Sequence, residues 1–579
     1  MKTYGKFIKK YKLFFILGPL LMLTEVGGEI VLPKLMAGMI DEGILTAHNM
    51  DFIVHQALTM LLCILIQVSG GIGGHYFSVR AAVNFSSDIR EELFNKIQTF
   101  SFKNIDEFST GSLVTRLTND VTQVMNITRM GLIMAVRSPA MLIGGVIMAF
   151  SINARLASVM LIMIPLLGLS IFIIMRMALP RFDHMQKSID NLNSKTQENI
   201  TNVRVIKSFV RRNFEIDKFN EASAQLRDRT LSAMKLVVCT MPVMTLAMNI
   251  TTIVVLWRGG NLVVGNEMLV GSLSAIVQYT TQILSSLMMV SMMIISSTRA
   301  IASIRRISEV LNTEVDLTDD RAGAKDKTVT NGDIEFRNVY FKYYKKLKTY
   351  ILENISFKIE GGKTLGIVGS TGSGKSSLVQ LIPRLYDADE GEILIDGVNV
   401  RDYSLYNLRE GVGMVLQKNV LFSGTIEDNL RWGDKDATMD EIRQNAGYAQ
   451  ADGFISNFTD GYNMELGQGG VNVSGGQKQR LCIARALLKK PKILILDDST
   501  SAVDTATEAQ IRKTFATTLK DTTKIIIAQR ISSIIDADKI LVLKDGKIVG
   551  EGTHSELLKA NSEYQEIYYS QMDREKEVS

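Results

Sequence analysis

The chain has 579 residues, more than one ordinary domain holds, and a mean hydropathy of +0.12 although 22% of its residues are charged. This combination indicates a membrane part joined to a soluble part. The net charge of +5 is mild and no strongly basic face stands out, which argues against a nucleic-acid partner. The three cysteines, Cys63, Cys239 and Cys482, fit neither a disulfide framework nor a zinc spacing, and we interpret them as reduced thiols.

Long apolar stretches in the first half of the chain predict membrane-spanning helices. Each is longer than the roughly 20 residues that a helix needs to cross the hydrocarbon. The first follows a Lys-rich tail, but it is too long for a secretory signal and no small-residue cleavage site follows it, so we expect a retained span. The six predicted spans are about 13–36, 52–78, 131–151, 156–179, 232–257 and 267–297.

Basic residues divide the connections between these spans into two classes. The N-terminal tail and the second and fourth connections are rich in Lys and Arg, whereas 37–50 has neither. The third connection contains only Arg155 and the fifth only Arg258. Because basic loops stay in the cytoplasm, we predict a multi-pass protein of the plasma membrane, surrounded by membrane lipid, with both termini cytoplasmic.

The two basic inner connections are about 50 residues long and have few turn signals. Residues 194–215 alternate polar and apolar positions at helical spacing. Such helices would project far beyond the bilayer, since 20 further residues of helix are about 30 Å long. The alternative is an amphipathic segment lying on the membrane, but Lys and Arg are distributed around the helix rather than on one face.

Two acidic residues and a group of methionines are the candidates for a substrate pathway. Glu25 and Glu29 lie one helical turn apart in the first span, and Glu25 is roughly 18 Å from the start of that span at 1.5 Å per residue, near the midplane. Intramembrane acids mark a pathway or a buried partner, so substrate contact and a structural pair in a water-filled cavity both stay open. Met289 and Met293, which recur with Met288 and Met292 at helical spacing, suit promiscuous binding or plain helix packing.

The apolar pattern stops after Arg306, and a polar segment follows at 312–333, which we interpret as a linker. From Ile334 onward short β-branched runs alternate with helical stretches, which is typical of an α/β domain. We therefore predict an all-α six-helix transmembrane domain over 1–311 and an α/β P-loop nucleotide-binding domain over 334–579.

The stretch "GSTGSGKSS" lies between a predicted strand and a predicted helix, as a phosphate-binding P-loop requires. Its glycines let backbone N–H groups face the phosphates, and we expect Lys375 to reach the outer phosphates and Ser376 to bind Mg²⁺. Asp497 ends the apolar run "LILD" at the edge of the sheet where ligands bind, and is a second candidate for Mg²⁺. The predicted loop comprises Gly369, Ser370, Thr371, Gly372, Ser373, Gly374, Lys375, Ser376 and Ser377.

Two further stretches resemble the ATP-binding cassette (ABC) superfamily. "VSGGQKQRLCIARALLKKP" at 473–491 resembles its signature motif, and "LQKNVLFSGTIEDNL" at 416–430 resembles its glutamine loop. The spans, the long inner connections and the C-terminal cassette together resemble the half-size exporters of that superfamily, over essentially the whole chain. The resemblance implies two cassettes that close head to tail on two ATP molecules, each held between one P-loop and the other chain's signature.

The resemblance also assigns roles residue by residue. It implies that Tyr343 stacks on adenine, that Gln417 joins Ser376 and Asp497 around Mg²⁺, and that residues 198–209 carry a helix that docks on the partner's cassette. The segment 464–470 resembles one that touches the inner connections in the family, and it keeps Glu465. It has Gly469 where the family commonly has Arg, which weakens the expectation of that contact. The signature residues that would cap the partner's ATP are Val473, Ser474, Gly475, Gly476 and Gln477; the loop across the dimer seam would be Ser501, Ala502, Val503 and Asp504.

Two positions depart from the pattern of a hydrolytic site. Asp498 stands where the family's general base is Glu, and Gln529 where a His normally touches the γ-phosphate. Asp is one methylene shorter, and Gln can donate a hydrogen bond but carries no titratable proton or positive charge. A tolerated acid-for-acid exchange is the alternative for Asp498 alone; both changes together resemble the degenerate-site subunit of heterodimeric bacterial multidrug exporters.

We therefore expect an ATP-driven exporter that binds ATP and Mg²⁺, hydrolyses ATP weakly in its own site, and lends its signature to a second half-transporter. The expected substrate is a hydrophobic or cationic small molecule. The alternatives are a homodimeric lipid or peptide exporter and a regulatory cassette protein that does not pump.

Overall fold

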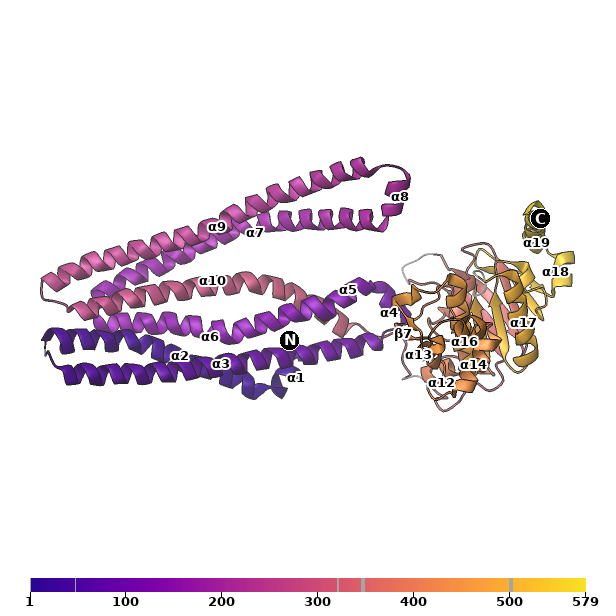
Figure 1. The fold of residues 1–579 in the computed structure, drawn as a ribbon, viewed down its shortest axis with the longest axis horizontal. Coiled ribbons are helices and arrows are strands. Elements are labelled where there is room, and N and C mark those ends of the chain that lie inside the picture. The colour runs from indigo at the N-terminus through magenta and orange to yellow at the C-terminus, as the bar shows by residue number, and fades with distance from the viewer. Residues whose placement is uncertain (1, 47, 320–321, 345–348, 499–502, 579) are drawn as a thin grey trace. The chain divides into compact units, whose positions relative to one another are not determined.

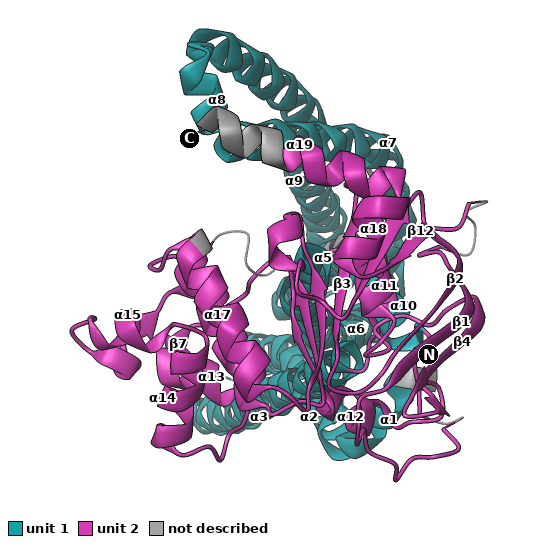
Figure 2. Ribbon diagram, turned by 90° about the vertical axis from the view of Figure 1, so that its right-hand side faces the viewer, with its two compact units in different colours: residues 1–98, 110–313 teal, residues 99–109, 314–579 magenta. Residues whose placement is uncertain are grey.

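The computed structural model describes residues 2–46, 48–319, 322–344, 349–498 and 503–578 (Figure 1). The chain forms two compact units, Met1–Gln98 with Thr110–Thr313, and Thr99–Ser109 with Glu314–Ser579 (Figure 2). The first unit is helical and the second is α/β, which confirms the predicted fold class.

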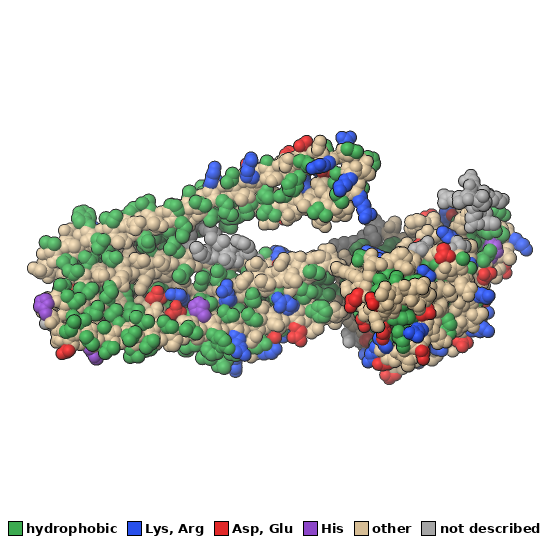
Figure 3. Space-filling model, in the orientation of Figure 1, with side chains coloured by type: hydrophobic (Ala, Val, Ile, Leu, Met, Phe, Trp, Pro, Cys, Tyr) green, Lys and Arg blue, Asp and Glu red, His purple; other side chains and the backbone are tan. Residues whose placement is uncertain are grey.

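In the described residues six helical segments are long and apolar enough to cross a membrane. The longest helix, α9, has 53 residues, about 80 Å at 1.5 Å per residue, so it extends far beyond a hydrocarbon core of about 30 Å. Apolar side chains cover much of the surface of this unit (Figure 3), as a lipid-facing surface requires. The helices of the first unit are α1 (Lys2–Lys10), α2 (Lys12–Gly38), η1 (Met39–Thr46), α3 (Met50–Gln98), α5 (Thr110–Thr115), η2 (Arg116–Asp120), α6 (Val121–Ile152), α7 (Ala154–Thr201), α8 (Val203–Ser208), α9 (Arg212–Val264) and α10 (Val270–Asn312).

Small residues allow the helices of the first unit to approach closely. A Cβ atom on Gly70 would lie 2.2 Å from Thr24 Oγ1, so α3 packs against α2 with almost no space between them. Close backbone contact of this kind is the usual way in which membrane helices associate, since lipid provides no hydrophobic drive. The α7–α9 pair forms a hairpin that diverges from the other helices toward α8 (Figure 1), and at its tip the apolar side chains of Phe209 and Val210 are 72% and 87% exposed.

The second unit contains two main sheets. A four-stranded antiparallel sheet has the order β2-β1-β4-β5, and a six-stranded sheet has the order β12-β11-β3-β10-β9-β6. All five residues of β9 are buried, as expected for a parallel strand covered on both faces. The strands are β1 (Ile334–Phe341), β2 (Leu352–Ile359), β3 (Thr364–Gly369), β4 (Glu390–Ile395), β5 (Val398–Asn399), β6 (Val412–Val415), β7 (Gly424–Thr425), β8 (Glu465–Leu466), β9 (Ile493–Asp497), β10 (Thr523–Ile527), β11 (Lys539–Lys544) and β12 (Lys547–Gly552).

A short segment from the membrane half belongs to the second unit. Helix α4 (Phe102–Glu107) packs beside Tyr386, whose hydroxyl donates a hydrogen bond of 2.8 Å to Asp106. The Nδ2 of Asn104 donates to the carbonyl of Glu314 at 3.2 Å. The remaining helices of this unit are α11 (Lys375–Gln380), α12 (Leu405–Glu410), α13 (Ile426–Arg431), α14 (Met439–Tyr448), α15 (Asp452–Ser456), η3 (Gly461–Asn463), η4 (Gln468–Gly470), α16 (Gly475–Leu488), α17 (Thr505–Thr518), η5 (Ile531–Ser533), α18 (His554–Ala560) and α19 (Ser562–Val578).

Candidate functional site

The predicted P-loop connects β3 to α11. Gly372 and Gly374 adopt φ values of 86° and 96°, a region that side chains rarely tolerate. A Cβ on Gly374 would also lie 2.8 Å from Leu352 Cδ2. The loop therefore curls tightly, and successive backbone N–H groups in such a curl form a concavity that suits an anion.

The side chain of Lys375 lies over this loop. Its Nζ donates hydrogen bonds of 2.8 Å to the carbonyls of Gly369 and Ser370. Burial lowers the pKa of Lys375, while the nearby carboxylates of Asp497 and Asp498 oppose that shift. A phosphate group would offer this partly desolvated ammonium a full negative charge in place of two neutral carbonyls.

The two residues predicted to bind Mg²⁺ most directly lie next to each other. Ser376 Oγ donates a hydrogen bond of 3.0 Å to Asp497 Oδ1. Burial raises the pKa of Asp497, and the hydrogen bond from Ser376 partly offsets it. A hydroxyl and a carboxylate are hard oxygen ligands of the kind that Mg²⁺ prefers, and Mg²⁺ usually completes its octahedron with water and phosphate oxygens. This donor set therefore fits Mg²⁺ brought in with a nucleotide.

These groups open onto a cavity of about 730 Å³, within the range usual for small-molecule sites. Tyr343, whose ring packs edge-on against Tyr386 and whose hydroxyl lies 2.9 Å from Ser377 Oγ, forms part of its wall. The residues that line the cavity are Tyr343, Ile351, Gly369, Ser370, Thr371, Gly372, Gly374, Lys375, Ser376, Ser377, Gln417, Asp497, Asp498, Ile527, Gln529, Glu563, Glu566, Ile567, Ser570 and Gln571.

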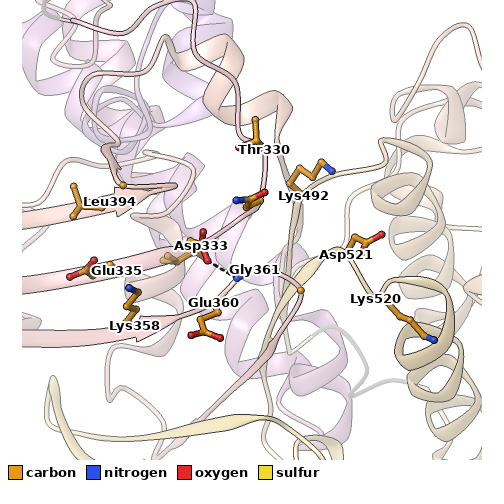
Figure 4. Close-up of a pocket in the computed structure, with 14 residues that line it drawn as sticks. Thr330, Asp333, Glu335, Lys358, Glu360, Gly361, Leu394, Lys492, Lys520 and Asp521 are labelled. Atoms are coloured by element: carbon orange, nitrogen blue, oxygen red, sulfur yellow. Dashed lines mark hydrogen bonds between the residues drawn. The ribbon is translucent and has the colours of Figure 1, made fainter.

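A second hollow of about 720 Å³ lies near the starts of β1, β3, β9 and β10 (Figure 4). The P-loop cavity lies at the other edge of the parallel sheet, where β3 and β9 end. Lysines such as Lys358 and Lys492 and acids such as Glu335 and Glu360 are interspersed around it. Ligands of open α/β sheets bind beyond the carboxyl ends of the strands, which is where the P-loop cavity lies. The P-loop cavity is therefore the candidate nucleotide site.

The two residues that depart from the hydrolytic pattern are bonded to each other. Gln529 Nε2 donates a hydrogen bond of 2.6 Å to Asp498 Oδ2. The backbone of Asp498 has a φ of 49°, and its N–H donates to the carbonyl of Ile527 at 3.1 Å. Gln479 Nε2 donates to the carbonyl of Asp498 at 3.2 Å. Asp498 is thus held from both sides of its backbone, and its short side chain points toward Gln529.

Helix α19 holds the segment that carries Gln529, a contact that sequence reasoning missed. Gln571 Nε2 donates a hydrogen bond of 2.8 Å to the carbonyl of Gln529, and Gln571 Oε1 accepts one of 2.9 Å from the N–H of Ile531. One side chain therefore bridges two backbone groups of this loop. A glutamine in the middle of a polar helix carries no local signal for such a contact.

The signature residues form the N-terminus of α16. Ser474 Oγ accepts a hydrogen bond of 3.3 Å from the N–H of Gln477, and Gln477 Oε1 accepts one of 2.9 Å from the N–H of Ser474, a reciprocal cap. Val473 is buried, whereas Ser474 and Gly475 are exposed. None of these residues is among those that line the P-loop cavity, so one chain does not bring signature and P-loop together.

The loop predicted to cross a dimer seam is described only in part. Val503 is buried, and Asp504 caps α17, its Oδ1 accepting from the N–H of Thr507 at 2.9 Å. Ser501 and Ala502 lie outside the described residues. Glu465 forms β8 with Leu466, and Gly469 adopts a φ of 70°, which any side chain would occupy with strain.

The two intramembrane acids share a partner that sequence reasoning missed. Arg137 on α6 lies 3.3 Å from Glu25 Oε1 through Nη1 and 2.9 Å from Glu29 Oε2 through Nη2. A basic residue inside the third predicted span was the signal that could have found it. Glu29 and Met289 line a cavity of about 120 Å³ with Arg137. Met293 is half-buried and does not line this cavity.

Comparison with known proteins agrees with this geometry. The family model described as "ABC transporter transmembrane region" matches residues 15–287, and the model described as "ABC transporter" matches residues 352–501. The "Uncharacterized ABC transporter ATP-binding protein YfiB" of Bacillus subtilis (strain 168) is 41% identical over 575 residues, 99% of both chains. The "Putative multidrug export ATP-binding/permease protein YgaD" of the same strain is 32% identical over 573 residues, 98% of both chains.

A solved structure shares the fold. The structure described as a bacterial Atm1-family ABC exporter with ATP bound aligns with a TM-score of 0.81 at 24% identity, covering 97% of this chain and 98% of the other. At that identity the likeness establishes the architecture and leaves substrate and assembly to be argued from the site itself.

Proposed function

The chain belongs to the ABC transporter family as a half-transporter of the exporter type, and from that premise we propose that it is the degenerate-site subunit of a heterodimeric exporter. The observation that most strongly supports this proposal is the hydrogen bond of 2.6 Å from Gln529 Nε2 to Asp498 Oδ2, beside the P-loop. Family membership makes the chain an ATP-driven membrane transporter; the division of labour between two chains is our proposal.

In this proposal the cavity binds ATP in the ordinary way. Tyr343 packs against adenine, the loop from Gly369 to Ser377 encloses the phosphates, and Lys375 turns from its carbonyl partners to the outer phosphates. Ser376 and Asp497, already in contact at 3.0 Å, would hold Mg²⁺ together with Gln417. The chemistry that the ion would supply there is neutralisation of phosphate charge.

ATP hydrolysis in this site is slow because Asp498, in the position of the general base, has a short side chain that already accepts a hydrogen bond. The carboxylate of Asp498 ends about 1.5 Å behind the position that a Glu would reach, one C–C bond length. Its Oδ2 already accepts a hydrogen bond from Gln529, so this oxygen faces a neighbouring side chain. Gln529 in turn can donate to a phosphate oxygen but cannot stabilise developing charge as a cation would.

A second chain is needed to complete each ATP site. The exposed N-terminus of α16, with Ser474 and Gly475 outside the chain's own cavity, offers first-turn backbone N–H groups to another molecule's nucleotide. The tip of the α7–α9 hairpin leaves Phe209 and Val210 exposed, and such an apolar tip suits a groove on the partner's cassette. A homodimer would pair two impaired sites, so the proposed partner is a different half-transporter with a working base.

The transported compound is proposed to be a hydrophobic or cationic small molecule that enters from the membrane, and the chain to lie in the plasma membrane with both termini cytoplasmic. The relative YgaD bears the name of a putative multidrug exporter. Glu29 and Met289 line an intramembrane cavity, with Glu25 beside it and Met293 one turn further along α10. A polar wall with soft, adaptable methionine side chains suits promiscuous binding.

The test is to purify the chain alone and with a co-expressed second half-transporter from the same cell, and to measure ATPase activity per cassette in nanodiscs. We expect a stable complex with high activity and a chain alone with little. Near-equal activity per cassette in the two preparations would instead support the homodimeric exporter.

A further inference from the structure

The small intramembrane cavity carries an unbalanced charge. Two carboxylates, Glu25 and Glu29, face one guanidinium, Arg137, which touches both. Lys34 and His75 are the next basic side chains on the packed helices α2 and α3, but both are exposed and neither lines the cavity. His75 Nδ1 is instead within 3.0 Å of the carbonyl of Gly71. With both acids ionised, the cluster holds one negative charge more than Arg137 balances.

An unbalanced charge at membrane depth is costly, and it is relieved by a proton or by a cation. Glu25 is the more enclosed of the two acids, with 12% of its side chain exposed, and Gly71 on α3 lies against its carboxyl group. Glu29 is 25% exposed and lines the cavity. The excess charge is therefore accessible from the cavity through Glu29.

Several polar groups around Glu29 already donate within the protein, whereas their oxygen atoms can still accept. Gln282 Nε2 donates to the carbonyl of Glu29 at 3.2 Å, which leaves its Oε1 buried without a partner among the described residues. The hydroxyls of Thr281 and Ser286 donate to carbonyls of their own helix at 3.2 and 2.7 Å. Both residues line the cavity, and their hydroxyl oxygens can still accept hydrogen bonds.

Ser138 provides a second unsatisfied buried group. It is 0% exposed, it lines the cavity, and its Oγ has no hydrogen-bond partner within the described part of the chain. A fully buried hydroxyl without a partner costs free energy that a ligand can recover. Glu29, Gln282 and Ser138 together present three acceptors, and a primary ammonium group has three donors.

We propose that this cavity is the binding site for the ammonium head of a lipophilic monocation. A volume of about 120 Å³ admits an ammonium group with little of the attached chain, so the apolar body lies along the surrounding apolar helices. This inference deepens the proposed function by naming the substrate class, and it rests on that function only for its biological meaning. Binding itself requires neither a partner chain nor ATP hydrolysis.

The test uses the full-length chain in lipid nanodiscs and measures equilibrium binding of radiolabelled dodecylammonium at pH 7, with dodecanol as the uncharged competitor of equal chain length. Wild-type protein should bind one saturable dodecylammonium that excess dodecanol does not displace. Glu29→Gln should weaken binding about tenfold or more, the factor that a lost charge-assisted hydrogen bond produces. Ser138→Ala should weaken it several-fold, and the exposed Glu267→Gln is the matched control with unchanged binding.

Arg137→Gln separates a cation site from a structural ion pair. Glu29→Gln and Arg137→Gln both break the same contact, so a purely structural pair would make both variants lose binding together. A cation site predicts opposite shifts, because removing the guanidinium adds to the excess negative charge and should tighten dodecylammonium binding. Equal loss in both variants, displacement by dodecanol, or unchanged binding in Glu29→Gln would each overturn the proposal.

Dodecylammonium binding and the heterodimeric assembly of the proposed function can fail independently. A chain that proves homodimeric can still bind dodecylammonium at Glu29, and a heterodimer with a degenerate ATP site can still fail to bind it. Should a variant not remain monodisperse, Glu25→Gln tests the charge count of the cluster, and Ser138→Ala tests its set of acceptors. Unchanged affinity in both would also refute the site.

Discussion

Lengthening Asp498 by one methylene should restore hydrolysis in this chain's own site. The backbone of Asp498 is held by the carbonyl of Ile527 and by Gln479, so the loop cannot simply shift forward. Asp498→Glu would advance the carboxylate by about 1.5 Å. Because a 1 Å misplacement can change a rate by about 100-fold, we expect hydrolysis in this site to rise about 100-fold, or about 2.7 kcal/mol in activation free energy.

The hydrogen bond from Gln529 modifies this expectation. At 2.6 Å it could also hold the longer carboxylate away from the attacking water. The double variant Asp498→Glu with Gln529→His should therefore exceed the single variant, because His can bind the γ-phosphate as a cation. Asp498→Asn is the matched control, with the same length and no charge, and should change wild-type turnover little.

The assay is a rapid-quench single-turnover measurement with labelled ATP, on the heterodimer whose partner site has been silenced. Only this chain's cavity then contributes to cleavage. The reasoning would be wrong if Asp498→Asn abolished the remaining hydrolysis while Asp498→Glu left it unchanged, since Asp498 would then already be an effective base.

Three further outcomes follow from contacts in the cassette. Ser474→Ala should lower heterodimer ATPase activity about tenfold, because it removes the cap of α16 that is proposed to face the partner's nucleotide. Steady-state turnover checks this, and an unchanged rate would count against a shared site. In the Gln529→His variant, adding Gln571→Ala should lower kcat more than it lowers nucleotide affinity, because Gln571 holds the loop that carries residue 529 by two hydrogen bonds. Equal losses of folding and affinity would indicate a merely structural role. Burial raises the pKa of Asp497, so this carboxylate gains its proton at a higher pH than an ordinary aspartate does. Mg²⁺-dependent ATP binding should therefore begin to fall at that higher pH as the solution is acidified. Titration of binding against pH tests this, and Asp497→Asn should remove the pH dependence.

Much of the architecture was predictable because its signals are local. The P-loop requires glycines at fixed spacing next to a strand, and Gly374 at a φ of 96° occupies the position that this pattern demands. The apolar helices can be identified from their length and composition. The pairing of Asp498 with Gln529 was unforeseen, although both positions were singled out, because the loops that follow β9 and β10 meet only after these parallel strands have paired.

The features that escaped prediction depend on packing between distant segments. Arg137 is one charge in an apolar span, and only the packing of α6 against α2 brings it to Glu25 and Glu29. Helix α4 belongs to the second unit through Tyr386 and Asp106, residues far apart in the sequence. Gln571 lies in a helix whose pattern carries no sign of the loop that it holds. Contacts of this kind follow from tertiary structure rather than from periodicity.

Nucleotide retention in the heterodimer tests the central claim most directly. The groups proposed to bind ATP, including Lys375 and Ser376, line the P-loop cavity, whereas the proposed departures at Asp498 and Gln529 concern cleavage alone. A single-turnover chase follows prebound labelled ATP while unlabelled ATP is added. We predict that one nucleotide per dimer leaves slowly as uncleaved ATP, and that Lys375→Ala shortens its retention; two nucleotides hydrolysed at equal rates would contradict the account.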